Sequence, residues 1–237
     1  MSITRDTRSH QFKPKSWMSR RSEAYFAKTL AARSRKSSNA RGLNRRGAAN
    51  KESGYKDLLS QALLFDTTGT IVLLCTIAQG AAVTERVGKK IRYKSIQFRM
   101  TINAGTAATL NSCSLLLVYD RRPTGALPAI TDVLIAATSV SLNNDTNSGR
   151  FKILKRYFLT LTGNSTTPDT GAEIVPLECY YKFRPNKDSI AAFKALASGA
   201  IGDIEQGALY VISVGSNAAG TTAALGTLNV RTRFLDI

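Results

Sequence analysis

The residues best suited to chemistry in this chain are its lysines and arginines, and they are unevenly placed. Residues 1–56 contain 15 lysines and arginines against 3 aspartates and glutamates, a net charge of +12. Residues 57–237 contain 18 against 13, a net charge of +5. Lysine and arginine side chains neutralise phosphates and release counterions without reading base sequence. The first quarter of the chain therefore predicts binding to a nucleic acid.

We call residues 1–56 the basic arm. The side chains predicted to contact phosphates are Arg5, Arg8, Lys13, Lys15, Arg20, Arg21, Arg33, Arg35, Lys36, Arg41, Arg45 and Arg46. Aromatic side chains stand among them and can stack on unpaired bases, namely Trp17, Tyr25 and Phe26. The second half of the basic set is also a candidate nuclear-import signal, formed by Arg33, Arg35, Lys36, Arg41, Arg45 and Arg46.

Groups that could perform catalysis are few. His10 is the sole histidine and lies in the basic arm, so a Ser-His-Asp or Cys-His arrangement would have to recruit it from there. The carboxylates of residues 57–237 stand mostly beside turn-forming residues. The glycines between Gly80 and Lys90 do not have the spacing of a phosphate-binding loop. We therefore expect no enzyme, no catalytic residue and no cofactor.

The three cysteines fall in apolar, strand-like stretches that are far apart in sequence: Cys75, Cys113 and Cys179. Their spacing does not suit a zinc site, so we expect reduced, buried thiols of an intracellular protein and no bound metal. No run of 18 apolar residues occurs, and the first twenty residues lack the apolar centre of a secretory signal. These features predict no membrane partner.

The basic arm has no apolar periodicity over residues 33–46, so we expect it to be largely disordered. A short helix on the face of Ser22, Phe26 and Leu30 that forms on binding is the alternative for its first part. The remaining chain, residues 57–237, is predicted to be one all-β domain. Its apolar alternation predicts strands within 62–77 and over 89–102, 114–119, 151–161, 177–184, 209–214 and 228–234.

The alternation over 89–102 changes phase near Lys94, which predicts a bulge or bend. Two short helices are predicted in loops, one over Asp132–Ala137 capped by Thr131 and one over Ser189–Ser198. Seven or eight strands with partly helical connections favour an antiparallel jelly-roll or Greek-key sandwich. Basic residues on these strands could line a basic inner face or simply be solvated: Arg92, Lys94, Arg99, Lys152, Lys155, Arg156, Arg231 and Arg233.

Several stretches in this order carry a family resemblance: Thr84–Ile91, Leu115–Gly125, Asn147–Leu154, Gly202–Tyr210 and Val230–Phe234. The chain resembles the capsid proteins of small circular single-stranded DNA viruses that encode a rolling-circle replication protein (CRESS-DNA viruses). The subgroup that it is similar to has shells like those of satellite plant viruses. The resemblance covers most of residues 57–237, whereas the basic arm matches only in composition.

The resemblance implies an eight-stranded jelly roll that self-assembles into an icosahedral T=1 shell of 60 copies. The basic arm would then point inward and package the single-stranded DNA genome. About sixty arms at +12 would supply roughly +720 charges for genome phosphates. Localisation would be the virion, and the host nucleus during assembly, with host import factors as further partners.

Two alternatives remain open at this point. A satellite RNA virus coat protein would have the same fold and a similar arm, because phosphate contacts do not distinguish DNA from RNA. A nucleic-acid-binding module that never forms a shell would remain a small oligomer at every salt concentration.

Overall fold

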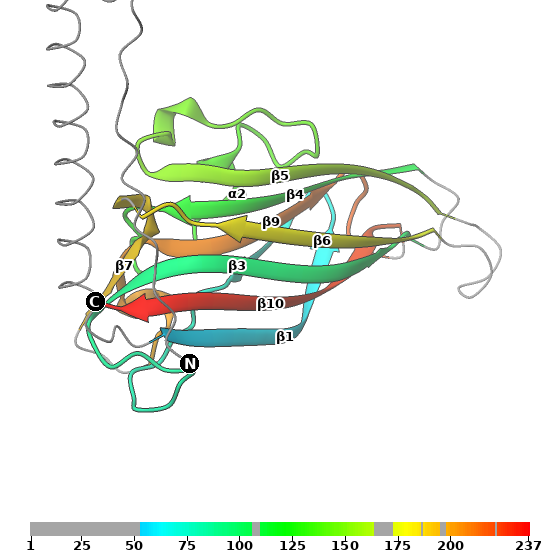
Figure 1. Cartoon of the computed structure of the whole chain (residues 1–237). Coiled ribbons are helices and arrows are strands. Elements are labelled where there is room, and N and C mark those ends of the chain that lie inside the picture. The colour runs from blue at the N-terminus through cyan, green and yellow to red at the C-terminus, as the bar shows by residue number, and fades with distance from the viewer. Residues whose placement is uncertain (1–52, 106–109, 164–172, 186, 195–197, 221) are drawn as a thin grey trace, which may run out of the picture. The chain divides into compact units, whose positions relative to one another are not determined.

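The computed structural model describes residues 53–105, 110–163, 173–185, 187–194, 198–220 and 222–237, which belong to a compact unit of residues 51–237. These residues form two stacked antiparallel sheets (Figure 1). Sheet A contains β1 (Ser53–Phe65), β10 (Ala224–Asp236), β3 (Lys90–Asn103), β6 (Ile174–Lys182), β7 (Ile190–Phe193) and β8 (Ile204–Gln206). Sheet B contains β2 (Thr70–Leu73), β9 (Ala208–Gly215), β4 (Leu110–Asp120) and β5 (Phe151–Thr162).

The strand order identifies the fold as a jelly roll. Leaving aside the short β7 and β8, sheet A has the order β1-β10-β3-β6 and sheet B has the order β2-β9-β4-β5. One sheet thus contains β1, β3, β6 and β10, and the facing sheet contains β2, β4, β5 and β9. This division of eight strands between two sheets is the double Greek key of a jelly roll. The prediction of an eight-stranded antiparallel jelly-roll sandwich is confirmed.

The predicted phase change in β3 is also confirmed. Ile91 and Tyr93 are buried, and so are Ile96 and Phe98, although the two pairs have opposite parity in the sequence. The pairing of β3 with β10 shifts register by one residue at Lys94, which has no partner in that ladder. A bulge at this point lets both halves of the strand bury their apolar side chains between the sheets.

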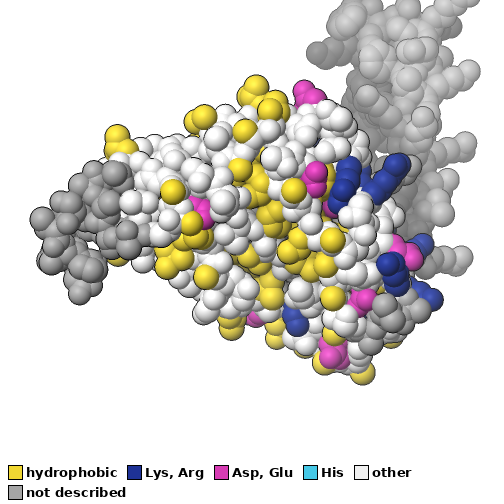
Figure 2. Space-filling view, turned by 180° about the vertical axis from the view of Figure 1, so that it is seen from behind, with side chains coloured by type: hydrophobic (Ala, Val, Ile, Leu, Met, Phe, Trp, Pro, Cys, Tyr) yellow, Lys and Arg dark blue, Asp and Glu magenta, His cyan; other side chains and the backbone are white. Residues whose placement is uncertain are grey.

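The outer face of sheet B is covered, and this explains the continuous apolar runs of β4 and β9. Leu116 and Ile212 are opposed across the two strands and are fully buried. The connection between β4 and β5, residues 121–150, lies over them and contains α2 (Ile130–Val133) and η1 (Asp145–Asn147). Figure 2 shows hydrophobic side chains across the middle and upper edge of the side opposite to that in Figure 1, with lysines and arginines gathered at one end.

Two helix predictions need correction. The first helix is α2, which starts one residue before the predicted cap Thr131 and ends at Val133, four residues before the predicted end. Its first turn is held by Asp132, whose carboxylate accepts a hydrogen bond from the Ala129 amide (2.9 Å).

The second helix, predicted over Ser189–Ser198, is wrong. Residues 187–189 form the 3-10 turn η2, and residues 190–193 form β7, which pairs with β3 and β8. Ala191 and Phe193 are buried there, because the sheet satisfies their backbone while it covers their side chains. A further 3-10 turn, η3 (Ile201–Asp203), precedes β8.

The first strand begins at Ser53, within the segment that we expected to be arm. All twelve predicted arm residues lie outside the described residues, as does the predicted helical face of Ser22, Phe26 and Leu30. The three cysteines are free and buried, as predicted. Burial raises the pKa of both Cys75 and Cys113 to about 11, so these thiols stay protonated at neutral pH.

Candidate nucleic-acid interface

The outward side of sheet A differs from that of sheet B in carrying exposed polar side chains along its strands. On β10, Asn229 and Arg231 alternate with the buried Leu228 and Val230. We call this surface the sheet A face, and define it by Tyr55, Asp57, Leu59, Arg92, Lys94, Gln97, Arg99, Thr101, Pro176, Glu178, Tyr180, Lys182, Thr227, Asn229, Arg231 and Arg233. Its residue types, arginines with amides and tyrosines, suit contacts with phosphates and bases.

Two arginines at the middle of this face are paired with carboxylates across strands. Arg231 donates two parallel hydrogen bonds to Asp57 from one edge of its guanidinium, with Nε–Oδ1 at 2.8 Å and Nη2–Oδ2 at 2.7 Å. Arg99 Nε lies 3.1 Å from Oε1 of Glu178 on β6. Hydrogen bonds from these arginines lower the pKa of Asp57 and of Glu178. A phosphate that binds either arginine must therefore compete with an ionised carboxylate.

One end of the face, with Arg184 two residues past the end of β6, carries cations without such partners. We call this group the basic end: Arg92, Lys94, Lys182, Arg184 and Arg233. In the strand registers, Ser95 lies opposite both Arg233 and Lys182, and Lys94 is its chain neighbour. Within the described part of the chain, none of the five takes part in an ion pair. Their combined positive charge favours binding of an anion at this end.

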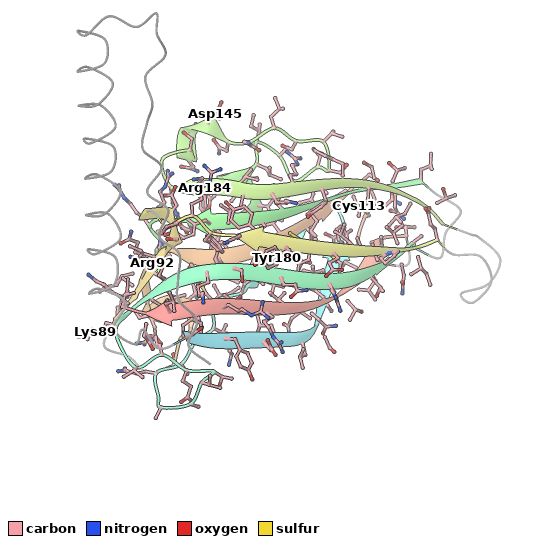
Figure 3. The ribbon with its side chains drawn as sticks, viewed as in Figure 1. Lys89, Arg92, Cys113, Asp145, Tyr180 and Arg184 are labelled. Atoms are coloured by element: carbon pink, nitrogen blue, oxygen red, sulfur yellow. The ribbon has the colours of Figure 1, made fainter. Side chains whose placement is uncertain are left out.

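The basic arm is joined to the sandwich at this same end. Ser53 opposes Leu235 in the β1–β10 register, and Leu235 opposes Arg92 in the β10–β3 register. Two inter-strand spacings, about 10 Å, therefore separate the first described residue from the backbone of Arg92. Figure 3 shows Arg92, Arg184 and Lys89 toward one end of the sandwich and Tyr180 nearer the middle of the sheet. A polyanion held by the basic end would therefore lie close to Ser53, the first described residue of the chain.

Two adjoining hollows lie beyond the basic end, over the middle of the face. One, of about 250 Å³, includes Gln97 and Leu59 in its lining, and the other, of about 490 Å³, includes Pro176 and Thr227. Arg99 and Asn229 line both.

Tyrosines lie at both margins of the sheet A face. The Tyr55 ring lies 5.0 Å below the Arg231 guanidinium, and Tyr180 is 55% exposed. Amides, tyrosines and shallow hollows allow bases to stack and hydrogen-bond while cations hold the phosphates.

The structure brings five of the eight predicted strand cations to this face: Arg92, Lys94, Arg99, Arg231 and Arg233. The other three lie on β5 in sheet B. Arg156 donates hydrogen bonds to Ser114 Oγ (3.1 Å) and to the Ser139 carbonyl (3.0 Å), and its burial lowers its pKa. It supports the connection over sheet B rather than a ligand.

Lys152 and Lys155 have local partners too. Lys152 Nζ lies 2.7 Å from Oδ2 of Asp188, and Arg121 Nε lies 3.0 Å from Oδ1 of the same carboxylate. Lys155 is exposed and lies 3.3 Å from the Tyr157 hydroxyl.

Two cations of the basic end were missed in the sequence: Lys182 and Arg184. A signal was present, because both stand on the polar parity of the strand predicted over 177–184, opposite the buried Cys179 and Phe183. Lys182 lies on the same side of the sheet as Arg233 because β6 pairs with β3, and the sequence alone does not show this pairing.

A metal site, a catalytic carboxylate or a membrane span among the described residues would indicate another kind of function. Within them, no group of three or more His, Cys, Asp or Glu side chains could hold a metal ion. The fully buried Asp120 is used structurally, in an ion pair with Arg150 at 2.9 Å. None of the helices in the described part of the chain has the length and apolar character needed to cross a membrane.

Comparison with known proteins gives a family match over nearly the whole chain. The model of the "Geminivirus coat protein/nuclear export factor BR1 family" matches residues 7–237, basic arm included. The "Capsid protein" of Miscanthus streak virus (isolate 91) is 30% identical over 166 residues, which are 61% of this chain and 63% of that protein. The chain thus aligns with less than two thirds of this relative's length.

Solved structures of two plant viruses are also similar. A chain of Desmodium yellow mottle tymovirus has a TM-score of 0.32 at 12% identity, covering 99% of this chain and 94% of its own length. A chain of tobacco necrosis virus has a TM-score of 0.32 at 14% identity, covering 79% and 96%. The jelly-roll assignment above rests on strand order and not on these two matches.

Proposed function

Because the chain belongs to the geminivirus coat protein/nuclear export factor BR1 family, we propose that it is the capsid protein of a single-stranded DNA virus and assembles into a closed icosahedral shell around the genome. The observation that carries the proposal is the basic end of the sheet A face, at the point where the basic arm joins the jelly roll. A structural role follows for the whole chain, with no catalysis.

The two cationic parts of the chain have different tasks in this proposal. The basic arm binds DNA phosphates without sequence preference, through the twelve residues from Arg5 to Arg46 named above. The basic end continues that path onto the sandwich, where Tyr55 and Tyr180 offer rings to unpaired bases. Packaging and assembly are then coupled, since DNA gathers the subunits while it neutralises their charge.

The shell itself follows from symmetry. Identical copies that repeat the same contacts close into a particle, and many weak contacts hold it together. We propose sixty copies in a T=1 shell, and sixty chains of 25.6 kDa have a mass of about 1.5 MDa. The cluster from Arg33 to Arg46 would bring the chain to the host nucleus for assembly, and the virion is its final location.

The test is light scattering of the purified protein after size separation, with absorbance at 260 and 280 nm recorded across the peak. We expect a megadalton particle with excess absorbance at 260 nm, whose cargo is degraded by DNase and not by RNase once released. A cargo digested by RNase alone would instead identify a shell that packages RNA.

The family description also covers a nuclear export factor, and this favours one alternative function. A chain that carries nucleic acid without forming a shell would use the same basic arm and basic end. It would stay a small oligomer at every salt concentration, with or without added single-stranded DNA. That result would overturn the capsid proposal.

A further inference from the structure

The connection over sheet B contains, between α2 and η1, a loop that displays apolar side chains to solvent. Ile135 is 62% exposed, Val140 73% and Leu142 73%, and on β5 beside them Phe158 is 59% exposed. We call these four residues the apolar patch. No charged residue occurs from Val133 to Asn144, in a chain with a net charge of +17. Clustered exposed apolar side chains of this kind mark an interaction surface.

The loop that carries the patch is rigidly built. The Ile135 amide donates to the Leu142 carbonyl (3.0 Å), and the Ala136 amide donates to Ser141 Oγ (2.9 Å). These bonds close the loop on itself. Its apolar side chains could fold back only if the bonds were broken, so their exposure is a fixed property of the loop.

The loop is also fastened to sheet B through one residue at its tip, Ser139. Its hydroxyl lies 2.9 Å from that of Ser112 on β4, and its carbonyl accepts from Arg156 Nη2 (3.0 Å). The same Arg156 guanidinium lies 4.4 Å from the centroid of the Phe158 ring. One arginine thus contacts both the tip of the loop and the aromatic ring, which fixes the loop near Phe158.

The chemistry of the patch decides what kind of partner it fits. It offers no cation to a phosphate, so it does not suit the nucleic acid that the sheet A face suits. Copies of a chain with charge +17 repel one another, and they approach most easily where a surface carries no charge. A stable interface of standard size involves roughly 20 residues on each partner, so the four side chains of the patch are too few to hold two copies together alone. A contact this small suits copies that are held by several neighbours at once.

We propose that the apolar patch is a contact between neighbouring copies of this chain in the assembled particle. The inference rests on the proposed function, because it takes a second copy as the occupant. It assigns the side of the sandwich with the connection over sheet B to subunit contacts, and leaves the sheet A face to the genome.

The test places a charge in the patch with Leu142→Asp and, separately, Val140→Asp. Both side chains are mostly exposed, so we expect thermal unfolding and the single-stranded DNA affinity of the subunit to be unchanged. Burial of an unpaired carboxylate against an apolar neighbour should lower particle yield by about tenfold or more. Val83→Asp is the matched control, an exposed apolar residue (51%) in the loop before β3, and should assemble normally.

A second measurement detects contact directly. The native cysteines are buried, so a maleimide reagent should report on Leu142→Cys or Val83→Cys alone. In intact particles we expect the thiol of Leu142→Cys to react about tenfold more slowly than that of Val83→Cys, as a buried group does.

The outcomes separate the inference from the proposed function. Normal assembly of both aspartate variants, or equal reaction of the two thiols, would overturn the inference alone and leave the patch for a host protein. Failure of Val83→Asp to assemble would also overturn the inference, because an added negative charge outside the apolar patch would then be enough to prevent assembly. A wild-type chain that never assembles would overturn both.

Discussion

At the scale of single residues, the cations of the sheet A face are not equivalent. Arg99 and Arg231 are engaged with carboxylates, whereas Lys94, Lys182 and Arg233 have no ion pair within the described residues. An exposed ion pair contributes little to stability, but it still gives an approaching phosphate a competitor. The unpaired cations should therefore account for most of the phosphate binding by the sandwich.

Replacing two of them tests this. We expect Lys94→Gln with Lys182→Gln to weaken binding to single strands of any sequence and to reduce the slope of log affinity against log salt by about 1.4, or 0.7 for each lost contact. Titration of fluorescent oligonucleotides at several salt concentrations measures both. The control, Arg122→Gln with Lys155→Gln, removes the same charge from exposed positions outside the face. Equal effects of the two pairs would mean that only net charge matters.

Asp188 links stability to pH. Hydrogen bonds from Arg121 and Lys152 lower its pKa below the ordinary value of 3.8, so near that pH the folded chain binds fewer protons than the unfolded chain. The stabilisation is complete above the ordinary pKa and is lost as pH falls through the lowered one.

We expect Asp188→Asn to cost about 1 kcal/mol at pH 7 and less at pH 3. Urea unfolding at both pH values measures this, with Asp145→Asn, an exposed carboxylate in η1, as control. A cost that did not shrink at pH 3 would assign the effect to packing.

At the scale of elements, the turn between β1 and β2 depends on one carboxylate. Oδ1 of Asp66 accepts hydrogen bonds from the Thr68 amide (3.0 Å), the Thr68 hydroxyl (2.9 Å) and the Gly69 amide. Gly69 has a φ of 73°, the left-handed region that glycine tolerates. The turn must be tight, because it carries the chain from sheet A to sheet B.

Asp66→Ala should therefore destabilise the fold by about 1–3 kcal/mol, because it removes the three hydrogen bonds that the buried Asp66 carboxylate accepts. Asp66→Asn keeps an acceptor oxygen and should cost less. Urea unfolding monitored by circular dichroism gives both values. Equal losses for the two variants would show that the negative charge, and not the acceptor, holds the turn.

Local patterns predicted the longer strands well. The phase change at Lys94 located the bulge, and the apolar runs of β4 and β9 located the two central strands of sheet B. The pattern failed at Ile190–Phe193, where four residues are too few to separate a helical stripe from a strand. The pairing of β7 with β3 decides that segment.

The site was less predictable, because its residues meet only through sheet pairing. Asp57 and Arg231 are 174 positions apart, and no local signal joins them. Lys182 and Arg184 join the other cations only when β6 is placed beside β3. Residue types and strand parity were readable from the sequence, but the strand order that brings the charges to one end was not.

At the scale of the whole molecule, charge and fold can be separated. Every strand among the described residues begins at or after Ser53, so removal of residues 1–46 deletes all twelve arm cations named as phosphate contacts without touching a described strand. We expect the truncated chain to keep its circular dichroism spectrum and unfolding transition but to purify free of nucleic acid, judged by absorbance at 260 nm. Retention of nucleic acid by the truncated chain would make the sheet A face the main binding surface.

The position of β10 has a consequence for how the chain folds. This strand lies between β1 and β3, yet it is the last of the three in the chain. Until it inserts, β1 and β3 each expose an unpaired edge to other chains. Closing such long loops is slow, on the order of milliseconds to seconds for all-β folds. The yield of folded chain is therefore set by a kinetic competition between insertion of β10 and edge-to-edge aggregation.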